Sequence, residues 1–169
     1  LDEAEYAASL GMDLIITDHH QPGPQLPRAA AVVDPHRKDC SGCFTGHCGA
    51  GVALLLISAM EERDWASVLE TFGPLAAVAT VGDVVPLRGA NRVIVSQGLQ
   101  RLPYTDSPGL RALLSVSGLA DKPVTASRVA FGLAPRINAA GRLGQIDAAV
   151  ELFLTQDPVR GEAAARLFC

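Results

Sequence analysis

Three consecutive side chains near the start of the sequence can bind metal ions or protons. Asp18, His19 and His20 follow the apolar run 14–17 (LIIT) directly. Neutral imidazole is a common ligand for transition metals, and a neighbouring carboxylate can fix the tautomer of the ring by accepting its other N–H. One histidine can therefore bind a metal while the other faces a substrate phosphate. The alternative interpretation is a polar turn at the surface.

A second candidate is Asp83, an isolated carboxylate in apolar sequence. Residues 76–82 (AAVATVG) precede it and residues 84–87 (VVPL) follow it. A carboxylate buried in such surroundings has to be hydrogen-bonded, paired or metal-bound, or else it stays protonated. The pattern predicts either a metal ligand or an aspartate that caps or ends a helix at the surface.

The segment 134–143 (APRINAAGRL) combines phosphate-binding side chains with small residues. Arg136 and Arg142 flank Asn138, and residues 139–141 are small enough to let a polymer backbone approach. The guanidinium group matches two phosphate oxygens at once. We expect this segment to contact a phosphate-containing ligand, unless its arginines only pair with local carboxylates at a helix junction.

Two weaker candidates lie between these motifs. Gly49 and Gly51 open a helix in the segment 48–56 (CGAGVALLL), where backbone N–H groups can approach a phosphate; close helix packing is the favoured alternative.

The same region holds cysteine and histidine side chains within nine residues. They make a poor structural zinc site, because the second ligand pair is two adjacent residues, so we expect free thiols. These side chains are Cys40, Cys43, His47 and Cys48.

The first predicted elements place the Asp-His-His triplet. Residues 2–10 have helical composition and end at Gly11, as expected for a left-handed cap. The short apolar runs 12–17 and 29–33 predict neighbouring parallel strands, joined by the loop 21–27. In an open parallel sheet, ligands bind beyond the carboxyl ends of the strands, which is where the triplet falls.

The rest of the chain reads mainly as helices. After the irregular segment 34–49, residues 50–62 predict a strongly apolar helix, and a short helix follows Trp65. Gly73 and Pro74 open a further helix over 75–81. From residue 91 onwards helices alternate with breaks at Pro103, Pro108, Pro123 and Pro135. The sequence therefore predicts an α/β fold in which a parallel sheet flanked by helices passes into a helical region.

The bulk properties limit the class of protein. The 169 residues suit one ordinary domain, and 49% of them are hydrophobic with few aromatic residues. No apolar run is long enough for a membrane span, and no basic-then-apolar leader is present, so we expect a cytoplasmic protein without membrane contact. Leu1 at the start and helical sequence at both ends predict a piece of a longer protein.

The charge is distributed unevenly. Residues 1–83 carry a net charge of −8 and residues 84–169 a net charge of +4. An acidic half beside a basic half suits a metal-dependent enzyme that acts on phosphates, although ordinary solvated faces would give the same numbers.

Four motifs in this order resemble one family. The triplet after an apolar strand (TDHH) is similar to the name-giving motif of the DHH phosphoesterases, and 79–87 (ATVGDVVPL) resembles their later aspartate motif. The segments 48–56 and 134–143 narrow the resemblance to the RecJ-type single-stranded-DNA exonucleases. It implies a partial DHH domain over 1–145 and the start of a connecting helical segment over 146–169.

The resemblance also implies roles for the candidate residues. His19 and Asp83 would be ligands in a site for two Mn2+ or Mg2+ ions. His20 would stabilise the scissile phosphate or protonate the leaving group, and Asp18 would orient His19. The nucleic acid strand would meet Arg136, Asn138 and Arg142, with Gly49 and Gly51 as secondary contacts. Single-stranded DNA would be the substrate, cut from its 5′ end during DNA repair and recombination, with repair or single-strand-binding proteins as candidate partners.

One departure from the family pattern affects this expectation. The family's Asp-x-Asp pair and a further bridging aspartate precede the triplet, whereas the 17 residues before Asp18 contain no such pair. The site for two ions is therefore incomplete, and we expect this chain to be inactive alone. Two alternatives remain open: a DHH phosphodiesterase for short oligonucleotides, cyclic dinucleotides or pyrophosphate, and a non-catalytic relative that binds single strands.

Overall fold

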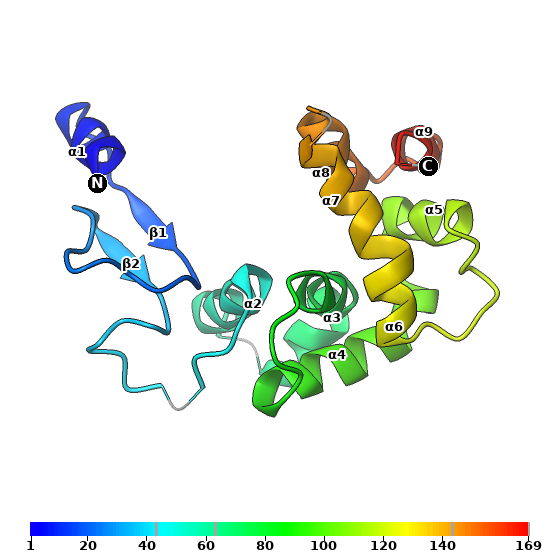
Figure 1. Cartoon of the computed structure of the whole chain (residues 1–169), viewed down its shortest axis with the longest axis horizontal. Helices are drawn as coiled ribbons and strands as arrows, with labels where there is room; N and C mark the ends of the chain where they lie inside the picture. The colour runs from blue at the N-terminus through cyan, green and yellow to red at the C-terminus, as the bar shows by residue number, and fades with distance from the viewer. Residues whose placement is uncertain (43, 63, 143, 169) are drawn as a thin grey trace.

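The computed structural model describes residues 1–42, 44–62, 64–142 and 144–168, without the side chains of residues 141 and 142. Figure 1 shows a small α/β layer at one end, helices across the middle and further helices at the other end. The predicted α/β fold is confirmed.

The N-terminal layer consists of helix α1 (Asp2–Ser9) and the parallel strands β1 (Ile15–Thr17) and β2 (Ala31–Val33). Ile15 pairs with Ala31 and Thr17 with Val33, so both strands end at the same edge. The predicted cap after α1 is confirmed, because Gly11 has a φ of +74° and its N–H donates to the carbonyl oxygen of Ala8.

The middle of the molecule contains α2 (Gly49–Met60), α3 (Trp65–Gly82) and α4 (Gly89–Arg101). The prediction of two helices between residues 65 and 81 is wrong, since α3 continues through Pro74. A proline inside a helix costs about 3 kcal/mol, because it removes one hydrogen bond and its ring meets the carbonyl group four residues earlier. Here Pro74 is buried beside the crossing of α3 and α4, where Gly73 lies against Gly98, and this packing offsets the cost.

A second proline also lies within a helical segment. Helix α6 (Ala126–Arg128), a π-helical turn (Val129–Leu133) and α7 (Ala134–Arg142) follow one another without a gap. The predicted break at Pro135 is therefore wrong. Because Pro135 cannot donate a backbone hydrogen bond, the turn before it widens to the π form instead of ending the helix.

The other predicted breaks are confirmed. Pro103 lies in the 3-10 turn η1 (Leu102–Tyr104) after α4, and Pro108 is the first residue of α5 (Pro108–Val116), where the Ser107 hydroxyl accepts a hydrogen bond from the N–H of Leu110. Pro123 lies in the loop before α6.

The C-terminal helices α8 (Ile146–Leu154) and α9 (Pro158–Arg166) pack into the larger core. This core joins Leu152 of α8 and Ala165 of α9 to buried side chains of α3 and α5, such as Val78 and Leu113. The domain boundary at residue 145 stays a prediction, and α8 and α9 share their hydrophobic core with the preceding helices. Within the described residues, no helix has the length and apolar character needed to cross a membrane.

Candidate active site

The Asp-His-His triplet lies directly after β1. The N–H of Asp18 donates to the carbonyl oxygen of Val33 at 3.0 Å, so the strand pairing extends one residue into the triplet. One carboxylate oxygen, Asp18 Oδ1, then accepts hydrogen bonds from the backbone N–H groups of His19 (2.7 Å) and His20 (3.2 Å). The chain therefore turns at Asp18, and its own side chain holds the turn.

Asp18 also contacts an imidazole ring, although not the predicted one. The ring nitrogen His20 Nδ1 lies 2.8 Å from Asp18 Oδ1. The resemblance implied that Asp18 orients His19; in the structure it orients His20. The hydrogen bond with His20, together with the backbone N–H groups of both histidines, lowers the pKa of Asp18 below its ordinary value of 3.8. Asp18 is therefore a carboxylate at neutral pH.

His19 points toward the helices. Its side chain is 20% exposed, and Nδ1 lies 3.6 Å from Asp83 Oδ2. On the other side of the ring is Gly49, the first residue of α2, where an added Cβ would lie 3.6 Å from His19 Cδ2. The rings of His19 and His20 are 4.2 Å apart between centroids. Thus the strand end, α2 and α3 all meet at His19.

Asp83 ends α3, and its carboxylate is exposed rather than buried. Its side chain is 41% exposed, and its N–H donates to the carbonyl oxygen of Ala79. Asp83 is therefore not buried, as its apolar sequence neighbours suggested. It ends a helix at the surface, which was the alternative expectation. A carboxylate at a helix C-terminus faces the negative end of the helix dipole, an unfavourable placement of about 0.3–1 kcal/mol. A nearby positive charge, on an imidazolium or a metal ion, would offset it.

A cavity of about 380 Å3 connects these groups with the helical half of the molecule. Its walls include His19, Asp83 and Gly49, together with Asn138 from α7 and Phe153 from α8. Among the described residues, the Asp18, His19 and His20 ligand atoms lie within 4.8 Å of one another and form the one group of three or more metal-binding side chains. The cavity thus brings four of the predicted site residues to one place: Gly49, His19, Asp83 and Asn138.

The two predicted arginines are placed differently. Arg136 donates from Nε to the carbonyl oxygen of Gly132 (3.1 Å) and from Nη1 to that of Phe168 (3.0 Å), so it ties α7 to the end of α9. The side chain of Arg142 lies outside the described residues. Of the two predicted contacts to nucleic acid whose side chains are described, Asn138 lines the cavity and Arg136 does not.

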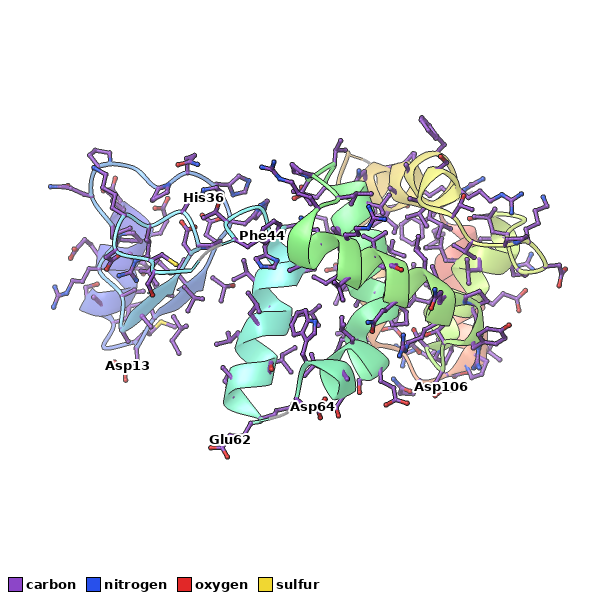
Figure 2. All side chains as sticks on the ribbon, turned by 90° about the horizontal axis from the view of Figure 1, so that it is seen from below. Asp13, His36, Phe44, Glu62, Asp64 and Asp106 are labelled. Carbon is purple, nitrogen blue, oxygen red and sulfur yellow. The ribbon has the colours of Figure 1, made fainter. Side chains whose placement is uncertain are left out.

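In the described part of the cysteine-rich segment, the cysteine and histidine side chains do not come together as a metal site. Cys40 is exposed, and the buried Cys48 Sγ lies 3.4 Å from Thr80 Oγ1. The ring of His47 lies edge-on against that of Phe44, with 4.8 Å between the ring centroids, and burial lowers the pKa of His47. Figure 2 shows Phe44 where the loop meets the helices. Gly51 packs on His47, where an added Cβ would lie 3.0 Å from Nδ1, so its close-packing alternative has direct structural support. Cys43 and Cys169 lie outside the described residues.

Sequence reasoning missed one residue that positions the site. Asn91 of α4 is fully buried, and its side-chain N–H2 donates to the carbonyl oxygens of Gly46 (2.6 Å) and Pro86 (3.1 Å). Gly46 lies just before α2 and Pro86 just after Asp83. Asn91 therefore links the two loops that border the cavity. An asparagine in the first turn of a helix resembles an ordinary capping residue, and no local signal distinguishes it.

Comparison with known proteins finds a family model that matches the first part of the chain. Residues 1–80 match the model described as the DHH family, N-terminal domain. The first part of the chain, which contains the DHH triplet, is therefore similar to the N-terminal domain of the DHH family. The predicted resemblance is thereby confirmed, and the DHH triplet is the segment that the structure places at the strand end.

Named relatives align with nearly all of this chain. It is 42% identical over 163 residues to the single-stranded-DNA-specific exonuclease RecJ of Bacillus subtilis, covering 96% of this chain and 20% of the relative. It is 42% identical over 153 residues to the enzyme of that name from Thermus thermophilus, covering 90% of this chain and 22% of the relative. The chain thus spans about a fifth of the length of these curated relatives.

Solved structures of similar proteins share the fold. An exonuclease RecJ bound to manganese superposes with a TM-score of 0.85 at 38% identity, covering 99% of this chain and 42% of that one. RecJ from Thermus thermophilus in complex with Mn2+ gives a TM-score of 0.83 at 36% identity, covering 99% of this chain and 25% of that one.

Proposed function

We propose that this chain forms part of the active site of a metal-dependent exonuclease that hydrolyses phosphodiester bonds in single-stranded DNA from the 5′ end. The observation that carries the proposal is the meeting of His19 and Asp83 in one cavity with Asn138. The names of the similar proteins support the substrate class, and their bound Mn2+ and Mg2+ support the metal.

The side chains present fit such a metal. An imidazole nitrogen and a carboxylate oxygen 3.6 Å apart offer the mixed donor set that suits Mn2+, and the carboxylate suits Mg2+. His19 and Asp83 would hold the ion. When bound, the metal would supply an activated water and neutralise charge on the phosphate. The positive charge of the ion would also offset the unfavourable interaction of Asp83 with the negative end of the α3 dipole.

The residues around this pair have separate tasks. Asp18 accepts a hydrogen bond from Nδ1–H of His20, so that in the imidazolium form of His20 the Nε2–H would give its proton to the leaving oxygen or donate a hydrogen bond to the phosphate. His20 is exposed and can meet a substrate entering from solvent. Asn138, which also lines the cavity, can donate hydrogen bonds to the phosphate backbone or a base.

The test uses the protein at the full length of its gene, with Mn2+, a long 5′-phosphorylated single strand and a dinucleotide offered side by side. We expect progressive loss of the long strand. Asp83→Ala should lower the rate of this loss at least about a hundredfold, because losing a metal ligand should cost at least as much activity as losing a residue that only orients such a ligand. Asp121→Ala, in an exposed turn, is the matched control.

Three results would contradict the proposal in different ways. Preferred cleavage of the dinucleotide would assign the protein to the short-oligonucleotide phosphodiesterases. Binding of the long strand without cleavage would indicate a non-catalytic relative. Equal activity of the Asp83→Ala and Asp121→Ala variants would remove Asp83 from the metal site.

A further inference from the structure

A second, apolar hollow lies beside the candidate active site, on the other side of the end of α3. It has a volume of about 260 Å3, and its walls come from the loop after α3 and from the segment 126–131. Two of its side chains, Val84 and Phe131, are each 86% exposed, and Leu87 is also exposed. Large apolar side chains from two separate segments therefore converge at the surface, next to Asp83.

Backbone geometry holds both of the most exposed side chains outward. Val84 has a φ of +59°, a left-handed conformation that is unfavourable for a β-branched residue. Phe131 is the middle residue of the π-helical turn, whose ends Val129 and Leu133 are buried. Strained backbone and π turns both concentrate at ligand sites, because they persist only where the surrounding structure enforces them. These outliers are two independent observations at one hollow.

The charges that follow the hollow's lining segment along the chain indicate the class of ligand. Arg88 follows Leu87 directly, and Arg92 lies one turn further along α4; both are exposed and have no ion-pair partner among the described residues. The first turn of α4 contains no acidic residue. Apolar side chains followed along the chain by unpaired arginines match the alternation of base and phosphate in a single strand. The hollow and the cavity adjoin along the chain, because Gly82 and Asp83 line the cavity while Val81 and Val84 line the hollow.

We propose that Val84, Leu87 and Phe131 form a platform for one unstacked base of a single-stranded nucleic acid, adjacent to the nucleotide held at His19 and Asp83. Arg88 and Arg92 bind the phosphates that flank this base. The inference rests on the proposed function, because it assigns a contact for the same strand. Since stacking on an aromatic ring does not depend on base identity, the platform adds affinity without sequence preference.

The first test compares Phe131→Ala with Tyr104→Ala in the protein at the full length of its gene. Tyr104 is 84% exposed and lies beyond the other end of α4, so it is a matched aromatic control. Binding of a labelled oligothymidylate is followed by fluorescence anisotropy in EDTA, where no cleavage occurs. We expect Phe131→Ala to weaken binding roughly tenfold, Tyr104→Ala less than about twofold, and Phe131→Trp to bind like the unaltered protein.

An abasic scan then locates the contact. Oligonucleotides with one missing base at successive positions should show one position that weakens binding of the unaltered protein about tenfold. The same position should have no further effect on Phe131→Ala. Equal sensitivity of both proteins at every position would overturn the platform.

Other outcomes separate this inference from the proposed function. If the protein cleaves single-stranded DNA in an Asp83-dependent way while Phe131→Ala binds normally, only the platform is overturned. If Phe131→Ala lowers the melting temperature and leaves binding unchanged, another part of the polypeptide covers the hollow, and the platform is again wrong. If the unaltered protein does not bind single strands, both proposals fail.

Discussion

Asp18 shows how one carboxylate can organise a site at the scale of a single residue. Its Oδ1 atom holds the backbone of His19, the backbone of His20 and the ring of His20 together. His19 is thereby left free to turn toward Asp83 rather than toward Asp18. The two adjacent histidines thus acquire different partners, which lets one serve as a metal ligand and the other as a proton donor.

This arrangement predicts a pH-dependent contribution to stability. Because the pKa of folded Asp18 lies below its ordinary value of 3.8, the carboxylate stabilises the folded state above that pH and loses this effect as pH falls through the lowered pKa. We expect Asp18→Asn to reduce the free energy of unfolding near neutral pH by less than about 1 kcal/mol, since the group is partly exposed. The difference should shrink below about pH 4, where protonated Asp18 resembles asparagine.

Urea unfolding of both proteins at several pH values measures this difference. Asp121→Asn, in an exposed turn, provides the control for simple loss of one carboxylate. A difference that stayed constant as the solution was acidified would show that the charge of Asp18 plays no part.

At the scale of the elements, the crossing of α3 and α4 fixes where Asp83 stands. The helices meet through Gly73 and Gly98, and α3 then runs on to its end at Asp83. The two glycines are not equivalent. A Cβ at Gly98 would lie 2.6 Å from the Cβ of Ala77 and closer still to the carbonyl oxygen of Gly73, whereas a Cβ at Gly73 would meet its nearest neighbour at 3.6 Å.

The crossing predicts opposite outcomes for two identical chemical changes. Gly98→Ala should destabilise the protein by about 1–3 kcal/mol, because the helices have to move apart. Gly73→Ala makes only ordinary contacts and gains up to about 1 kcal/mol of helix propensity, so it should be neutral or stabilising. Urea denaturation of the two variants measures both effects. If Gly98→Ala were as stable as Gly73→Ala, the backbones would not be in the close contact described here.

At the scale of the whole molecule, local sequence predicted the parts of the site that depend on local order. An apolar strand that ends in Asp18 predicts a polar group at a sheet edge, and the structure places it there. The predictions at Pro74 and Pro135 are wrong for different reasons: tertiary packing keeps Pro74 within α3, and a π-helical turn accommodates Pro135. Asn91 bonds to Gly46, 45 residues away, and Arg136 to Phe168, 32 residues away. Such pairings arise only when the chain is folded, so no local pattern contains them.

The number of metal ligands predicts the behaviour of these 169 residues on their own. His19 and Asp83 supply two ligands, and Asp18 already accepts three hydrogen bonds, whereas two divalent ions with several oxygen ligands each need more carboxylates. We expect the isolated chain to be folded by circular dichroism, to bind Mn2+ only weakly by calorimetry, and to leave 5′-phosphorylated single-stranded DNA intact. Asp83→Ala should abolish the residual Mn2+ binding. Mn2+-dependent cleavage by the isolated chain that disappears in Asp83→Ala would show that the described side chains suffice, and the expected need for further aspartates would then be wrong.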